Sequence, residues 1–203
     1  MVISHKHKFV HIAISKAGTA SILSAFEHLD ANNKRHAEYN KKQSCSLHGD
    51  ITEFYDRVPL GESYFKFCFT RNPYSRIVSV YYQYRKRQGL KSPRRRELYE
   101  LSNKLSFSEF IKTVDWSERS MLEYITHDNK VHIDYIGKQE NLCADFTTLV
   151  DKHLKLKNIK LPMKNESKEK QKHYTEYYDA TSRDIISERY AEDLKYFKYK
   201  YGE

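Results

Sequence analysis

Two short apolar segments, each followed by a turn and then by a helix-forming segment, constrain the fold of this chain most. Residues 8–15 (KFVHIAIS) and residues 63–70 (SYFKFCFT) are rich in β-branched and aromatic residues and precede residues that end a strand. Apolar residues at helical spacing follow the first segment, in residues 19–29. After the second segment, Pro73 suits the first position of a helix because no amide hydrogen is needed there. The order predicts strand, turn and helix, twice over.

The same alternation continues in the second half of the chain. Residues 131–137 (VHIDYIG) predict a third strand. The apolar positions of the helix expected after it are Leu142, Phe146, Leu149 and Val150. Near the end, Thr181 and Asp184 have the spacing of a capping box. The helix expected behind this box buries Ile186, Tyr190, Leu194 and Phe197. Alternating strands and helices predict an α/β fold, a central parallel sheet flanked by helices, in a single domain of residues 1–203.

Two basic segments interrupt this pattern. Residues 85–97 (RKRQGLKSPRRRE) and residues 157–174 contain few apolar residues, so we expect exposed, irregular connections, either of which would suit a mobile lid. The stretch from Arg85 to Arg96 fits two interpretations, a surface that attracts an acidic glycan and an ordinary solvated loop. Two interpretations also stay open, core packing and sugar stacking, for Tyr174, Tyr177 and Tyr178.

A formal net charge of +9 over 203 residues indicates an anionic partner, because such a charge attracts anions over a long range. Charge alone leaves nucleic acid, a nucleotide, an acidic polysaccharide and an acidic membrane surface open, and the 17 tyrosines would provide stacking surfaces for bases. No apolar run approaches the ~20 residues that span a bilayer. The first ten residues also lack the pattern of a secretory signal. We therefore expect a cytoplasmic protein without an integral membrane segment.

The cysteines agree with that expectation. Cys45, Cys68 and Cys143 cannot all pair within one chain, and none has a metal-ligand spacing such as C-x-x-C. We interpret all three as reduced thiols, with Cys68 in a core strand.

The turn after the first predicted strand contains a lysine among small residues. Ligands of open parallel sheets bind beyond the carboxyl ends of the strands, where turns lead into helix N-termini that attract anions. Lys16 lies at such a turn and would add a full positive charge, and Thr19 and Ser21 would add hydroxyl donors to the same anion. The small residues that would let an anion approach are Ala17, Gly18, Thr19, Ala20 and Ser21. An ordinary strand-to-helix turn with a solvated lysine is the alternative. The segment is not a nucleotide-triphosphate P-loop, because the lysine precedes the glycine.

The turn after the second predicted strand contains a second candidate anion site. Arg71 stands at the turn, and Ser79 lies two turns into the following helix. A guanidinium can contact two phosphate oxygens at once, and a serine hydroxyl can donate to the same group. An arginine at a strand end is otherwise a common surface ion-pair partner. Together the two turns suit a ligand with two separated phosphates.

At these two turns the sequence resembles the sulfotransferases that use 3'-phosphoadenosine 5'-phosphosulfate (PAPS). SKAGTAS is similar to their 5'-phosphosulfate loop, and TRNPYSRIVS to their 3'-phosphate motif, R-x-P-x-x-R-x-x-S. The resemblance implies a P-loop-like nucleotide-binding architecture, in which residues 16–21 hold the 5' end of the donor while Arg71 and Ser79 hold its 3'-phosphate. It also implies that no metal is needed. The commoner loop pattern is P-K-T-G-G-T, from which this chain departs at Ser15 and Thr19.

A third segment, SCSLHGDITEF, is similar to the segment with the catalytic histidine in heparan sulfate 6-O-sulfotransferases. The resemblance, which extends to bacterial sulfotransferase family 2 proteins, implies His48 as the base and Lys16 as the group that stabilises charge on the donor. The products would be adenosine 3',5'-bisphosphate and a sulfated hydroxyl acceptor, expected to be a carbohydrate. Asp50 or Glu53 would orient His48 or cap the next helix, and we favour the cap for Asp50. We also expect a group that closes over the donor, formed by Lys170, Lys172, His173 and Tyr174.

Two other functions stay open from the sequence. One is a basic, tyrosine-rich module that binds nucleic acid without catalysis, with affinity that falls steeply with salt. The other is a nucleotide kinase, which would prefer ATP with magnesium. The position of Lys16 before the glycine argues against the kinase.

Overall fold

The computed structural model describes residues 1–27, 29, 46–58, 60–86, 92–114, 118–162 and 172–203. The chain divides into two compact units. The first unit comprises Met1–Arg71 and Met121–Glu166, and the second comprises Asn72–Ser120 and Ser167–Glu203. The first candidate anion-binding turn lies in the first unit, and so does Arg71 of the second turn, whereas the residues from Asn72 onward belong to the second unit.

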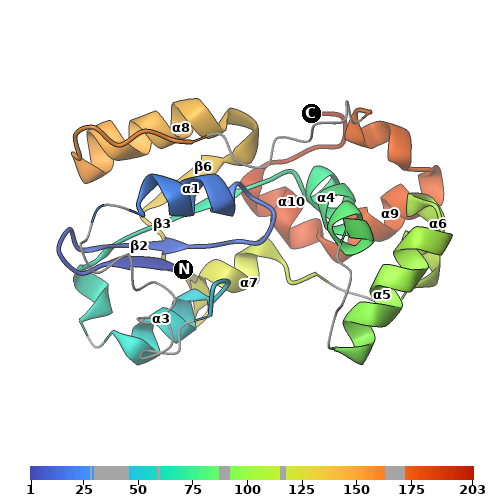
Figure 1. Ribbon diagram of the computed structural model, residues 1–203, viewed down its shortest axis with the longest axis horizontal. Helices are drawn as coiled ribbons and strands as arrows, with labels where there is room; N and C mark the ends of the chain where they lie inside the picture. The colour runs from blue at the N-terminus through green and yellow to red at the C-terminus, as the bar shows by residue number, and fades with distance from the viewer. Residues whose placement is uncertain (28, 30–45, 59, 87–91, 115–117, 163–171) are drawn as a thin grey trace. The chain divides into compact units, whose positions relative to one another are not determined.

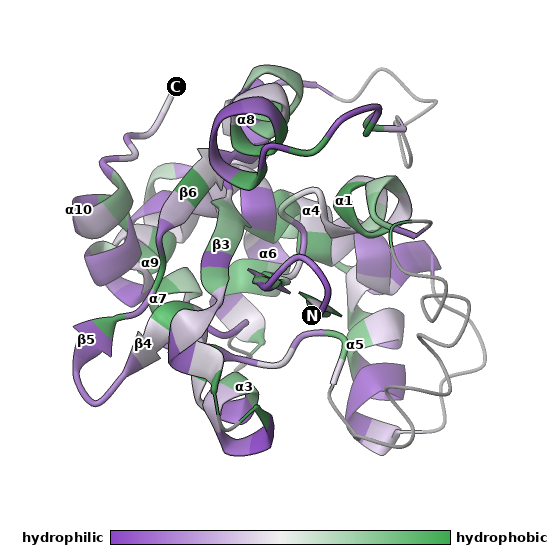
Figure 2. Cartoon of the chain, turned by 90° about the vertical axis from the view of Figure 1, so that its left-hand side faces the viewer, coloured by the Kyte–Doolittle hydropathy of each residue, from purple (hydrophilic) through white to green (hydrophobic). Residues whose placement is uncertain are grey.

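The first unit is built around a mixed sheet with the strand order β1-β2-β3-β6. The strands are β1 (Val2–Ser4), β2 (Phe9–Ile12), β3 (Phe65–Thr70) and β6 (Tyr135–Lys138). β2 pairs with β3 and β3 with β6 in parallel, so the expected parallel core is confirmed. The sheet is not parallel throughout, because β1 adds an antiparallel edge to β2. Figures 1 and 2 show α1 and α8 on one face of this sheet and α3 and α7 on the other.

The third strand lies further along the chain than its pattern predicts. β6 begins at Tyr135, whereas Lys130–Val131 forms β5, which pairs with β4 (Thr126–His127) in a small antiparallel hairpin. Asp128 and Asn129 form its turn with φ of 47° and 59°. Aspartate and asparagine tolerate this left-handed turn conformation, which matches the twist of a hairpin. The apolar residues at 131 and 133 therefore follow a turn signal that the strand prediction overlooked.

The helices of the first unit are short. They are α1 (Thr19–Ala25), α3 (Ile51–Arg57), the 3₁₀ turn η2 (Gly61–Ser63), α7 (Met121–Ile125), the 3₁₀ turn η3 (Gln139–Asn141), α8 (Leu142–Thr148) and the π-helical turn η4 (Leu149–Leu154). α1 ends four residues before the predicted boundary at residue 29. The helix predicted after the third strand is confirmed in α8 and η4. Its buried residues include Phe146, which packs on Phe26 with ring centroids 5.5 Å apart.

The second unit is helical in the part of the chain that the structure describes. Its elements are α4 (Pro73–Lys86), α5 (Pro93–Lys104), α6 (Phe107–Thr113), the 3₁₀ turn η5 (Tyr174–Tyr177), α9 (Ala180–Arg189) and α10 (Ala191–Phe197). Pro73 is the first residue of α4, as predicted, and Asn72 caps this helix by accepting a hydrogen bond from the Tyr74 amide at 3.1 Å. The expected irregular connection of residues 85–97 is wrong at both ends, because α4 extends to Lys86 and Pro93 opens α5. Residues 87–91 lie outside the described residues.

The C-terminal helix differs from its prediction in its start and in its continuity. Asp179, not Thr181, is the cap, since its carboxylate accepts the Ser182 amide at 2.8 Å while the Ser182 hydroxyl accepts the Asp179 amide at 3.1 Å. The predicted pair has the same spacing two residues later, so spacing could not choose between them. A break at Tyr190 divides the predicted helix into α9 and α10. Its expected apolar stripe is nevertheless buried at Ile186 and Phe197.

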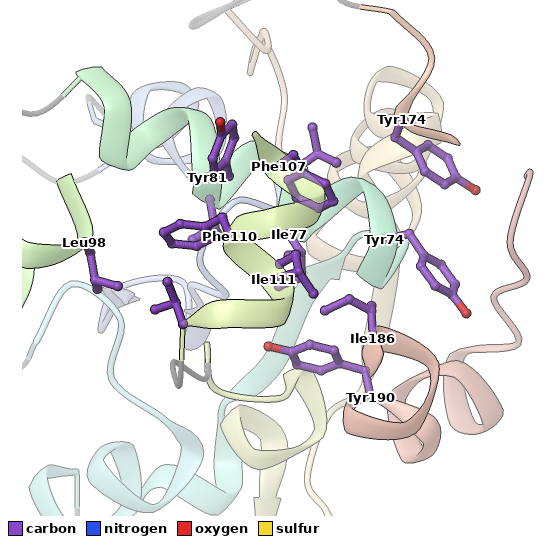
Figure 3. Packing of buried hydrophobic residues seen from close by; sticks show 13 residues of the cluster. Tyr74, Ile77, Tyr81, Leu98, Phe107, Phe110, Ile111, Tyr174, Ile186 and Tyr190 are labelled. Carbon is purple, nitrogen blue, oxygen red and sulfur yellow. The ribbon is translucent and has the colours of Figure 1, made fainter. Parts of the chain in front are cut away.

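An aromatic core holds the second unit together, and Figure 3 shows its packing. Tyr81 packs edge-to-face on Phe110, with ring centroids 5.4 Å apart. Tyr178 packs on Phe107 at 4.7 Å, and its hydroxyl donates to the Tyr74 carbonyl at 2.9 Å. Tyr174 and Tyr177 lie in or against the same cluster. Of the two interpretations of these tyrosines, core packing is therefore confirmed.

The first unit buries an ionisable side chain in its sheet. His11, in β2, is 1% exposed and stacks on Phe67 with ring centroids 5.1 Å apart. Burial lowers the pKa of His11 to about 3, compared with 6.5 for an exposed histidine. Below pH 6.5 the unfolded chain therefore takes up a proton that the folded chain refuses, so stability present above this pH is lost as the pH falls toward 3.

We predict that His11 lowers the free energy of unfolding by about 2 kcal/mol between pH 7 and pH 5. The variant His11→Leu removes the titrating group and should show a correspondingly flatter dependence on pH. Urea unfolding at a series of pH values measures both slopes. Parallel slopes for the variant and the wild type would contradict this role of His11.

Candidate functional site

The loop between β2 and α1 has an unusual backbone conformation. Lys16 and Gly18 have φ of 66° and 81°, and Ala17 between them does not have a positive φ. Backbone amides in such alternating conformations point into a common concavity, called a nest, that suits an anion. For a lysine the left-handed conformation is costly, so neighbouring contacts must hold it. α1 has seven residues, so its dipole is small. The candidate anion site is therefore the loop itself.

The loop is held from inside by a threonine. Thr19 Oγ1 donates to the Ile14 carbonyl at 2.8 Å, and the Ser21 amide donates to the Gly18 carbonyl at 3.1 Å. Thr19 and Ser21 are both buried. A hydroxyl has a single proton, so Thr19 must exchange its bond to Ile14 if it is to donate to a bound anion. Its predicted contact with the donor stays a prediction.

Arg71 joins the second predicted turn to the first. Its Nη1 donates to the Lys16 carbonyl at 3.2 Å, and its backbone amide donates to Met121 Sδ at 3.5 Å. Arg71 directly follows β3, and β3 pairs in parallel with β2, so the carboxyl ends of both strands meet at one edge. The structure therefore brings Lys16 and Arg71 together.

His48 is anchored to the same loop. Its Nδ1 lies 2.7 Å from the carbonyl oxygen of Ala13, the residue that follows β2. A carbonyl oxygen accepts and never donates, so Nδ1 carries the proton of this bond. The neutral imidazole then has its basic lone pair on Nε2. The side chain is exposed, and its tautomer is the one that a general base acting through Nε2 requires.

The two carboxylates after His48 do different things. Asp50 caps α3 by accepting the Glu53 amide at 2.8 Å, so the favoured interpretation of Asp50 is confirmed. Glu53 accepts two hydrogen bonds from Ser46, one from its amide and one from its hydroxyl, each at 2.9 Å. Arg57 lies on the other side of this carboxylate, with Nε 3.2 Å from Oε1. Sequence reasoning missed Ser46 and Ala13, because neither residue type signals a contact with a histidine loop.

Other predicted residues are placed elsewhere. Ser79 is half-buried on α4 in the second unit, and its proposed pairing with Arg71 stays a prediction. Cys68 is buried in β3, as expected, and burial raises the pKa of its thiol. Cys143 is an exposed cysteine on α8, and Cys45 lies outside the described residues. Of the group expected to close over the donor, His173 and Tyr174 lie at η5, and Lys170 is outside the described residues.

The described residues contain neither a membrane-spanning helix nor a cluster of metal-ligating side chains. No described helix combines the length and the apolar character that crossing a membrane requires. Within the same ranges, no three side chains of His, Cys, Asp or Glu gather as a set that could hold a metal ion.

The fold and these loops define an α/β protein with its candidate site at the carboxyl ends of parallel strands. The model of the sulfotransferase family matches residues 1–200, nearly the whole chain, and the chain belongs to this family. Family membership supports a sulfotransferase activity and confirms the resemblance and the fold class. The chain is also 31% identical, over 97 residues, to an uncharacterized protein of Archaeoglobus fulgidus, a match that covers 46% of this chain and 70% of that protein. No solved structure matches the chain.

The loop conformation generates a prediction for Gly18. An alanine Cβ there would be strained at φ 81° and would lie 3.1 Å from Leu142 Cδ2. We expect Gly18→Ala to lower the free energy of unfolding by about 1–2 kcal/mol, measured by urea unfolding.

A matched control is Gly202→Ala, which has φ of 94° but no neighbour within 4 Å of the added Cβ. It should cost less, because it adds strain without a contact. Adding Leu142→Ala to Gly18→Ala should relieve only the contact. Equal stability of Gly18→Ala and the wild type would show that the loop does not need its left-handed glycine.

Proposed function

We propose that this chain is a PAPS-dependent O-sulfotransferase that transfers a sulfuryl group to a hydroxyl of a carbohydrate, with both units forming one sulfotransferase domain. The observation that carries the proposal is the 3.2 Å hydrogen bond from Arg71 to the Lys16 carbonyl. It joins the two loops that the family resemblance assigns to opposite ends of the donor. Membership of the sulfotransferase family favours this function over a nucleic-acid-binding module and over a nucleotide kinase.

The loop residues fit the 5' end of such a donor. The alternating backbone at residues 16–18 is of the kind that forms a nest for an anion, and the Lys16 side chain would add a full positive charge to it. The residues proposed to hold the 5'-phosphosulfate are Lys16, Ala17, Gly18, Thr19, Ala20 and Ser21. Arg71 and Ser79 are proposed to hold the 3'-phosphate. A guanidinium carries several N–H donors, enough to contact both the Lys16 carbonyl and a phosphate.

His48 is the proposed general base. Transfer forms a bond from the acceptor oxygen to sulfur and breaks the bond from sulfur to the bridging oxygen, which leaves adenosine 3',5'-bisphosphate. His48 Nε2 takes the acceptor proton, a role supported by the proton that the Ala13 carbonyl holds on Nδ1. Lys16 stabilises the negative charge that grows on the leaving oxygen. Positioning and electrostatic stabilisation do most of the work in such an in-line transfer, and no metal is required in this proposal.

The carbohydrate acceptor rests on the resemblance and on charge. Arg94, Arg95 and Arg96 are exposed in the first turn of α5, and Arg94 pairs with Glu97 at 2.8 Å. Exposed cations of this kind would suit an acidic glycan. A cytoplasmic location stays part of the proposal, supported by the buried thiol of Cys68, which suits a reducing compartment.

Donor binding can be tested by thermal shift. We expect adenosine 3',5'-bisphosphate at 100 times its dissociation constant to stabilise the protein by about 2.7 kcal/mol, and ATP with magnesium to stabilise it less. Lys16→Ala and Arg71→Ala should each lose most of the effect. Lys6→Ala removes an exposed lysine of the same unit and serves as the control. Equal stabilisation by ATP with magnesium, or equal losses in Lys6→Ala and Lys16→Ala, would contradict the proposed site.

The base can be tested with His48→Asn. The asparagine amide keeps an N–H donor for the Ala13 carbonyl but has no basic nitrogen. We expect turnover to fall by about 10²–10⁴-fold while stabilisation by adenosine 3',5'-bisphosphate is retained. Release of this product from PAPS, with a panel of neutral and acidic oligosaccharides as acceptors, measures the turnover. A variant that turns over like the wild type would exclude His48 as the base.

A further inference from the structure

We infer that Glu53 is a positioning residue that fixes His48 through the loop of residues 46–49. The inference rests on the proposed role of His48 as the base. In this inference the Glu53 carboxylate contacts neither the imidazole nor the substrate. It holds the residues on both sides of the histidine.

The contacts of Glu53 with Ser46 carry the first step. Oε1 accepts the Ser46 amide and Oε2 accepts the Ser46 hydroxyl, each at 2.9 Å. Two charge-assisted bonds to one residue fix both its position and its rotation. Arg57, one turn further along α3, lies 3.2 Å from Oε1 and holds the carboxylate in place. Ser46 is thereby tied to the first turns of α3.

Gly49 carries the second step, on the other side of the histidine. A Cβ at Gly49 would lie 2.3 Å from Glu53 Oε2, a distance that real side chains do not reach. The chain at residue 49 therefore passes close to the same carboxylate and to Met1 Cε, which an added Cβ would meet at 2.5 Å, so a side chain there would have to displace Glu53 and Met1. Ser46 and Gly49 lie on either side of His48, so the Glu53 side chain contacts the loop at both ends.

The need for such a device follows from the surroundings of the histidine. Ser46, Leu47 and His48 are exposed, with Leu47 at 49%, so side-chain packing orders them little. Hydrogen bonds to the backbone hold them instead: Glu53 accepts the Ser46 amide, and the Met1 amine donates to the carbonyls of Ser46 and Leu47. A base must lie within hydrogen-bond reach of the proton that it takes, and a misplacement of about 1 Å can cost 10²-fold in rate. The ring has its own anchor at the Ala13 carbonyl, 2.7 Å away. That anchor works only if the backbone places the ring beside β2, and Glu53 contributes to this placement together with the Met1 amine.

In this arrangement, different groups set the position of the His48 ring and the basicity of its Nε2. In many enzymes a carboxylate bonds the imidazole directly and stabilises its protonated form. Here the neutral Ala13 carbonyl accepts the hydrogen bond from Nδ1. The Glu53 carboxylate binds Ser46, two residues before the histidine. Loss of Glu53 should therefore lower the rate without moving the midpoint of the pH–rate profile. If the carboxylate acted on the ring by its charge, its loss would move that midpoint to lower pH, because a neighbouring negative charge stabilises the protonated imidazole.

The test compares Glu53→Ala, Glu53→Gln and Ser46→Ala, with Asp56→Asn as the matched control. Asp56 is an exposed carboxylate on the same helix. We expect Glu53→Ala to lower kcat by about 10–100-fold, with the KM for PAPS and the stabilisation by adenosine 3',5'-bisphosphate unchanged. Glu53→Gln should rescue part of the loss, because its amide oxygen still accepts one bond. Ser46→Ala should lose less than Glu53→Ala, because the amide bond remains.

A second readout is the ¹⁵N NMR spectrum of the imidazole, assigned by the signal that His48→Asn removes. In the wild type the proton should reside on Nδ1, and in Glu53→Ala the Nδ1–H tautomer should become less populated. Asp56→Asn should leave it unchanged. A role in stability alone would lower the melting temperature of Glu53→Ala without changing this signature. If Glu53→Ala does not fold, Glu53→Gln and Ser46→Ala decide the question by the same readouts.

The outcomes separate this inference from the proposed function. A wild-type protein that transfers no sulfuryl group would overturn the function, whereas the tautomer comparison would still decide whether Glu53 positions His48. Wild-type kcat and an unchanged tautomer in Glu53→Ala would overturn the positioning role and leave the function standing. A shifted midpoint of the pH–rate profile in Glu53→Gln would overturn it too, in favour of direct electrostatic action on the ring.

Discussion

The hydrogen bond from Arg71 to the Lys16 carbonyl is the interaction on which the candidate site depends. Parallel pairing of β2 and β3 brings the two strand ends to one edge, and this bond then joins the residues that follow them. A left-handed lysine costs about 1–2 kcal/mol. A hydrogen bond from a charged group contributes about 1.5–3 kcal/mol, and the Thr19 bond to Ile14 adds to it. The two contacts together are large enough to hold Lys16 in its strained conformation.

The histidine loop uses a different physical strategy. Lys16 is held by contacts from within its own sheet edge, whereas His48 is held at two levels, the ring by Ala13 and the backbone by Glu53. A neutral carbonyl fixes the tautomer without adding charge to the ring. A charged carboxylate fixes the loop without touching the ring. In the proposal that His48 is the base, separate groups thus set the placement of the imidazole and its electrostatic surroundings.

Sequence patterns predicted what depends on local periodicity and failed where tertiary contacts decide. The two strands that lead to Lys16 and Arg71 were predictable because their apolar runs are bounded by clear breakers. β1 was not, because three residues on an antiparallel edge carry too little pattern. The cap at Asp179 and the expected one at Thr181 have identical spacing, so only the fold selects between them. The start of the third strand was misplaced because Asp128 and Asn129 form the turn of a hairpin that apolar content does not reveal.

In the candidate site, too, local features could be predicted and tertiary contacts could not. The strand-to-helix turns indicated Lys16 and Arg71, the resemblance indicated His48, and the structure brings these three around one loop. The contacts of Glu53 with Ser46 could not be predicted, because they depend on which way a loop turns before α3 begins. The role of Asp50 was predictable, since a cap is a local interaction between neighbours in sequence.

At residue 16, the stability of the backbone conformation and the proposed binding of the donor favour different residue types. Glycine at residue 16 would adopt the same backbone conformation without strain, yet it would remove the ammonium from the loop. A chain optimised for thermal resistance alone would therefore discard the cation. In the proposed function, the strain at residue 16 is therefore retained for the charge that the lysine adds to the donor site.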